Sequence, residues 1–171
     1  MATSAAASTI SRGCDLIDKN LWSRITRRIA KDEDVTLELA ERILDQALAF
    51  LALCAEKQET DLHYSPSTMV DIGWHTFILY TREYLSFCDK IAGRFIHHEP
   101  SDIPGVTYPR GQIGRTVEAL IARGFYVDRP LWLQANANLS ELNHGAADCN
   151  SYCTGDSCSG GGGDGDSGCS H

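Results

Sequence analysis

Apolar residues between positions 14 and 143 recur every three to four residues, which is the spacing of one face of an α-helix. Alternation with a period of two, which indicates a half-buried strand, is weak throughout the chain. The first stretch puts five apolar residues on one stripe: Leu16, Ile17, Leu21, Ile25 and Ile29. The sequence therefore predicts an all-α fold, a single-domain bundle of about five helices.

Capping residues indicate where the later helices begin and end. Thr36 is a candidate N-cap for the longest helix, which has a broad apolar face. Ser65 and Pro66 form a start signal, and Gly93 is a suitable stop for the same helix. After the first stripe, the predicted helices are 36–57, 65–92, 113–123 and a short one from 129.

The composition changes sharply near residue 143. Residues 144–171 hold four of the seven cysteines and 8 of the 15 glycines, and they contain no Leu, Ile, Val or Phe. Such a segment cannot bury enough apolar area to offset its chain entropy. We expect a flexible leader over 1–13, a helical domain over 14–143 and a disordered Cys- and Gly-rich tail over 144–171.

The charge balance excludes two classes of partner. A formal net charge of −8 disfavours nucleic acid and anionic membranes, because both require a basic surface. No apolar run reaches transmembrane length, and the first 15 residues do not resemble a secretory signal. We expect a cytoplasmic protein that can bind a protein partner through its tail or through the basic stripe of its first helix.

Asp71 and His75 are spaced i, i+4 on the helix predicted over 65–92, so they share one face. This spacing lets a carboxylate and an imidazole reach one metal ion. It equally lets the carboxylate accept the ring N–H, as in a surface pair or a buried hydrogen-bonded histidine. Both interpretations stay open on spacing alone.

A second group of possible ligands, His97, His98 and Glu99, follows the helix stop. Imidazoles are common ligands of Zn and Fe, and a loop that folds back would bring one of them near His75. The metal ligands predicted from the sequence are Asp71, His75, His97 and His98, with Glu99 as an outer carboxylate or base. The alternative is a structural clasp built from the same side chains.

The tail carries further soft donors. Their gaps do not match the C-x2-C spacing of zinc fingers, so metal binding, disulfides and free thiols all remain open. These donors are His144, Cys149, Cys153, Cys158, Cys169 and His171.

A block around Trp74 resembles a known family. Residues 70–79 read VDIGWHTFIL, and they are followed at intervals by Tyr84, Phe87-Cys88, Gly93, His97-His98 and Pro100. This pattern resembles the glycine-rich-domain-containing-protein-like family, in particular its short bacterial members that end in a Cys- and Gly-rich tail. The resemblance adds weight to the Asp and His residues of the block but implies no reaction.

Two functional hypotheses follow from these patterns. The first is a metal-binding helical protein with a divalent ion, Zn or Fe, and catalysis at an open metal position as its extension. Trp74 and Tyr80 would line that site. The second is a non-enzymatic adaptor in which the same residues form a hydrogen-bond clasp.

Overall fold

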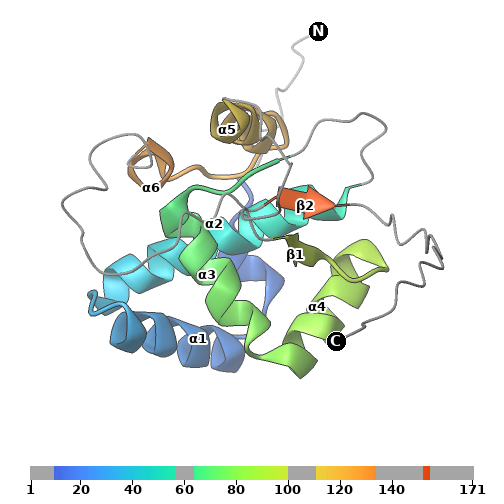
Figure 1. The fold of residues 1–171 in the computed structure, drawn as a ribbon. Coiled ribbons are helices and arrows are strands. Elements are labelled where there is room, and N and C mark those ends of the chain that lie inside the picture. Colours follow the sequence, from blue (N-terminus) through green and yellow to red (C-terminus); the bar gives the residue numbers. More distant parts are fainter. Residues whose placement is uncertain (1–9, 57–63, 100–110, 134–151, 155–171) are drawn as a thin grey trace, which may run out of the picture.

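The chain is described by a computed structural model over residues 10–56, 64–99, 111–133 and 152–154 (Figure 1). These ranges confirm the all-α class, with six α-helices, one short 3-10 helix and two short strands. None of the helices in these ranges is long and apolar enough to cross a membrane. The elements are η1 (Gly13–Leu16), α1 (Lys19–Asp32), α2 (Leu37–Ala55), α3 (Thr68–Ile78), α4 (Thr81–Ala92), β1 (His97–Glu99), α5 (Gln112–Ala122), α6 (Arg129–Leu133) and β2 (Tyr152–Thr154).

Helix α2 runs through the middle of the molecule and contacts η1, α1, α3, α4 and α5 (Figure 1). Every residue from 43 to 51 is buried. The predicted N-cap is confirmed, because the Thr36 hydroxyl accepts a hydrogen bond from the Leu39 amide at 3.2 Å. The middle of α2 is thus buried on all sides, which fits its mainly apolar sequence and makes it the core around which the other helices pack.

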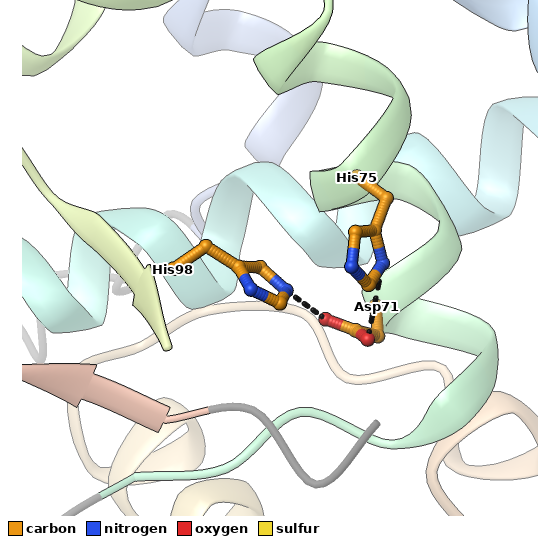
Figure 2. Close-up of side chains that lie close together, drawn as sticks. All are labelled: Asp71, His75 and His98. Carbon is orange, nitrogen blue, oxygen red and sulfur yellow. Dashed lines mark hydrogen bonds and ion pairs between the residues drawn. The ribbon is translucent and has the colours of Figure 1, made fainter. Parts of the chain in front are cut away.

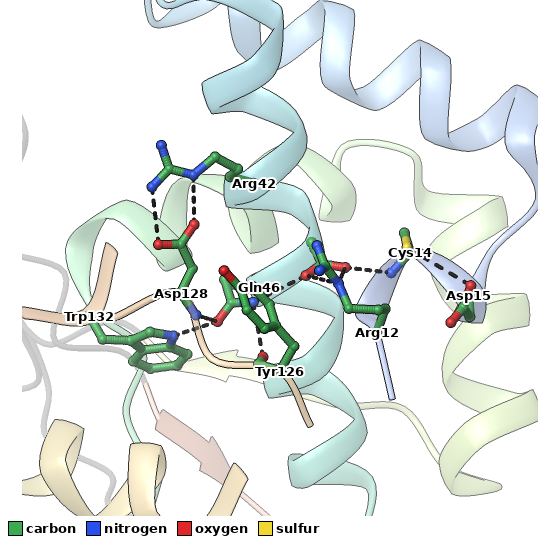
Figure 3. A network of polar contacts seen from close by, with 9 residues as sticks. Arg12, Cys14, Asp15, Arg42, Gln46, Tyr126, Asp128 and Trp132 are labelled. Carbon is green, nitrogen blue, oxygen red and sulfur yellow. Dashed lines mark hydrogen bonds and ion pairs between the residues drawn. The ribbon is translucent and has the colours of Figure 1, made fainter. Parts of the chain in front are cut away.

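A buried polar network joins α2 to the segment around α6 (Figure 3). The Gln46 side-chain oxygen accepts from the Trp132 indole N–H at 2.8 Å and from the Asp128 amide at 3.0 Å. Its Nε2 donates to the Tyr126 carbonyl at 3.2 Å. Arg42 pairs with the Asp128 carboxylate through two contacts, at 2.6 and 3.0 Å. Burying an amide is costly without partners, and this network supplies them.

The single helix predicted over 65–92 is wrong, because the structure has α3 and α4 in its place. Tyr80 leaves the helical region at φ −87° and ψ 59°. No Gly or Pro lies at this break. Instead, the Arg24 guanidinium lies 5.1 Å from the Tyr80 ring centroid, and the Tyr80 hydroxyl donates to the Arg24 carbonyl at 3.3 Å. The break therefore accompanies tertiary contacts with α1, which a local pattern cannot show.

Of the two ends of this region, only the C-terminal one lies where local chemistry places it. Gly93 ends α4 in the left-handed conformation at φ 64°, as predicted. The start is shifted, since Ser67 rather than Ser65 caps α3 and accepts from the Val70 amide at 3.2 Å. The Ser65 hydroxyl donates instead to Gln112 Oε1 of α5 at 2.8 Å. Serine is a good N-cap at either position, so the use of Ser67 rather than Ser65 goes with the tertiary contact that Ser65 makes with α5.

Strands β1 and β2 pair antiparallel, with His98 opposite Cys153 in the register. Neither strand was predicted, because three residues are too few to establish a period of two. β2 belongs to the segment 144–171. Most of that segment lies outside the described residues, as do residues 1–9, and of the predicted tail donors only Cys153 falls within a described element. The predicted domain boundaries stay a prediction.

Helices α2 and α3 approach each other closely at Gly73. A Cβ built there would lie 2.7 Å from Ala47 Cβ and 3.1 Å from the Ile43 carbonyl oxygen. Both separations are shorter than ordinary van der Waals contacts. Asp71 and His75 lie two residues to either side, so this approach also places their side chains relative to the core.

Replacing Gly73 with Ala should therefore lower the free energy of unfolding by about 1–3 kcal/mol, the usual cost of overpacking. Within a helix, Ala is by itself more favourable than Gly by about 0.5–1 kcal/mol, and the expected loss of stability already includes this gain. Urea denaturation measures the difference. Gly114→Ala is the matched control, because a Cβ there meets nothing within 4 Å and should leave stability unchanged or higher. Equal stability of the Gly73 variant and wild type would contradict the close approach.

Candidate metal centre

Asp71 lies in the first turn of α3 and is buried, with 3% of its side chain exposed. His75 lies one turn further along the same face. Its Nδ1 is 3.1 Å from Asp71 Oδ2, and 47% of its side chain is exposed. The i, i+4 spacing thus produces the direct contact that it predicts.

The second imidazole comes from β1. His98 Nε2 lies 3.1 Å from the other carboxylate oxygen, Asp71 Oδ1, and 11% of the His98 side chain is exposed. The ring centroids of His75 and His98 are 4.2 Å apart. Figure 2 shows both rings directed at the carboxylate that lies beside them. The prediction that the chain folds back after Gly93 is confirmed for His98.

Three of the four predicted ligands therefore meet. Asp71, His75 and His98 each offer one donor atom, and these atoms lie within 4.8 Å of one another. His97 is outside the group, because it is exposed and its ring packs on Phe95 at 4.8 Å between centroids. Adjacent residues of a strand face opposite sides, so only one of two neighbouring histidines can point inward. The side chain of Glu99 lies outside the described residues.

Asp71 and His75 each stabilise the charged form of the other. Burial by itself raises the pKa of the Asp71 carboxyl, but hydrogen bonds from His75 and His98 outweigh it and lower the pKa below its ordinary value. The hydrogen bond to Asp71 raises the pKa of His75, against the opposing effect of partial burial. An ionised carboxylate only accepts hydrogen bonds, so each ring nitrogen that faces it carries the proton.

One protein family matches this part of the chain. The model of one family, described as UCP032817-like, matches residues 15–110, more than half of the 171 residues. The chain belongs to the UCP032817-like family. No curated protein and no solved structure matches the chain. The family is uncharacterised, so function must be argued from the site itself.

Membership in the UCP032817-like family corrects the resemblance drawn from the sequence. The block around Trp74 had suggested the glycine-rich-domain-containing-protein-like family, and that assignment is wrong. The family match includes Asp71, His75 and His98 and ends before the Gly- and Cys-rich segment. The matched part of the chain therefore contains all three residues that meet in the site.

Tyr84 was not predicted as part of the site environment, whereas Trp74 was expected there and lies against His98. The Trp74 indole N–H donates to the Tyr84 hydroxyl at 2.9 Å, and the Trp74 ring packs on His98 at 4.3 Å between centroids. Tyr80, expected at the site, instead contacts α1 through Arg24. Trp74 and Tyr84 lie on different helices, so no local pattern joins them. Both residues belong to the sequence block around Trp74, but nothing in their spacing indicated this contact.

The raised pKa of His75 makes its contribution to stability depend on pH. In metal-free protein this contribution is complete below the unfolded pKa of about 6.5 and is lost as the pH rises through the higher folded pKa. The difference in unfolding free energy between wild type and His75→Gln should therefore shrink as the pH rises from about 6. Urea denaturation with chelator at a series of pH values measures it. A difference that stays constant with pH would contradict the charged hydrogen bond.

Proposed function

We propose that the protein binds one divalent metal ion through Asp71, His75 and His98. The observation that carries this proposal is the convergence of one carboxylate and two imidazoles, from α3 and β1, with donor atoms within 4.8 Å of one another. Asp71 and His75 are four residues apart on α3. His98 lies much further along the chain, after α4 and Gly93. Such convergence of ionisable groups marks a functional site more often than an arbitrary surface position.

The donor set suits Zn²⁺ or Fe²⁺. Imidazole is a favoured ligand of both ions, and two histidines with one carboxylate are a known set for either. Donor atoms 90–109° apart on an ion with bonds of about 2.1 Å lie about 3.0–3.4 Å from each other. Each ring lies 3.1 Å from Asp71, within that range, but each contacts a different carboxylate oxygen, and the three donor atoms as a set lie within 4.8 Å of one another. Small movements of the imidazoles would complete the set.

Three protein ligands leave at least one coordination position open. Zinc sites with three ligands hold water in the fourth position, and iron takes more. The 47% exposure of the His75 side chain gives solvent a path to this position. On the inner side, Trp74 is fully buried and packs on His98, which excludes water there. A site open on one side is suited to an exchangeable ligand, which is the extension of this proposal towards catalysis.

Metal binding would exchange protons for the ion. The ring nitrogens that now donate to Asp71 must lose their protons before they can coordinate. Metal affinity is therefore expected to fall at acidic pH, where His75 is charged.

The alternative is a structural clasp, and the hydrogen bonds at 3.1 Å are the observation that favours it. They satisfy the buried carboxylate and join β1 to α3 without any ion. A clasp predicts a melting temperature that is insensitive to chelator. A metal site predicts stabilisation that grows with free metal, by about 2.7 kcal/mol at one hundred times the dissociation constant.

Metal content distinguishes the two. Untagged full-length protein, stripped with chelator and dialysed against Zn²⁺ or Fe²⁺ under argon, should retain one ion per chain by ICP-MS. Asp71→Asn and His98→Ala should each lower the affinity at least tenfold, because each removes a donor atom. Absence of bound metal in the wild type would leave the clasp.

Two matched variants make the experiment specific. His97→Ala removes the neighbouring histidine, whose ring lies outside the group, and should bind metal like the wild type. All measurements use a full-length background in which the tail cysteines are serine, since thiolates bind these ions on their own. The replaced residues are Cys149, Cys153, Cys158 and Cys169.

A further inference from the structure

Two hydrogen bonds in series link the helix that carries the ligands to the start of β1. The Trp74 indole N–H donates to the Tyr84 hydroxyl at 2.9 Å, and that hydroxyl donates to the Ile96 carbonyl at 2.7 Å. All three residues are buried, with at most 1% exposed. Ile96 lies two residues before His98, so the second bond holds the backbone just ahead of the ligand.

Trp74 also contacts the His98 ring from its inner side. The Trp74 ring lies 4.3 Å from the His98 ring, between centroids, and Trp74 directly precedes His75 in α3. Trp74 is itself held by Phe50 of α2, at 5.4 Å between ring centroids. The position of His98 relative to Asp71 therefore depends on a rigid chain of contacts that starts in the core.

Tyr84 is the central member of this chain. It is the one side chain among these that contacts both Trp74 on α3 and the backbone that leads into β1. Burial raises the pKa of its hydroxyl, so the group stays protonated and remains a donor at physiological pH. Phe77 packs edge-on against its ring at 5.2 Å between centroids, which fixes the ring plane.

We propose that Tyr84 is a positioning residue for the metal centre, whose hydroxyl sets the placement of His98 relative to Asp71 and His75. The inference rests on the proposed metal-binding function. Groups that orient a metal ligand without touching the ion commonly change affinity by about 10–100-fold when they are removed. Tyr84 acts one step further out, through the backbone of Ile96, and should affect both affinity and coordination geometry.

Cobalt titration of the full-length protein tests this, because Co²⁺ reports affinity and geometry through its visible absorption. Tyr84→Phe removes one oxygen atom and both hydrogen bonds, and should weaken Co²⁺ binding by about tenfold or more with altered absorption bands. Tyr80→Phe is the matched control. It removes a hydroxyl that also donates to a backbone carbonyl, that of Arg24, but next to α1. Its affinity and spectrum should equal those of the wild type.

A rescue variant separates positioning from folding. Replacing Tyr84 with p-aminophenylalanine keeps the ring and an N–H donor towards Ile96, and should restore affinity and spectrum relative to Tyr84→Phe. If Tyr84→Phe does not fold, this variant is compared directly with the wild type and should match it. A folded Tyr84→Phe protein with a lower melting temperature but unchanged Co²⁺ affinity and spectrum would overturn the positioning role. A wild type that binds no Co²⁺ or Zn²⁺ would overturn the metal site itself, which is a distinguishable result.

Discussion

The close packing of α3 on α2 at Gly73 is the constraint on which the rest of the structure depends. Because Gly73 has no Cβ, α3 can lie close to the central helix α2. A Cβ at this position would lie only 2.7 Å from the Cβ of Ala47. This approach buries Trp74 against Phe50 and brings Asp71 below the surface. The site is therefore a consequence of how two helices pack, since the glycine lies between Asp71 and His75, the two site residues on α3.

A buried carboxylate must have partners, and here two imidazoles from separate elements supply hydrogen bonds to it. The same three side chains serve a metal ion or a clasp, and the difference is whether the ring nitrogens carry protons or coordinate. Trp74 and Tyr84 matter in both cases, because they join α3 to the backbone before His98. The aromatic core and the polar site are thus one connected unit.

The parts of the fold predicted correctly are those that local chemistry controls. Thr36 caps α2 and Gly93 ends α4, because a hydroxyl acceptor and a left-handed residue act within one helical turn. The contact between Asp71 and His75 is equally local, one turn apart on one helix. The break at Tyr80 and the pairing of β1 with β2 were not predicted, because both depend on contacts with distant segments.

The sequence by itself determined the helical class, the helix ends at Thr36 and Gly93, and the face shared by Asp71 and His75. It also placed two histidines after the turn at Gly93, without deciding which of them points inward. Only the tertiary structure decided that His98 meets Asp71 while His97 faces Phe95. The physical reason is that side chains alternate along a strand, so their direction depends on how the strand is anchored to the core, and Tyr84 and Trp74 provide that anchor.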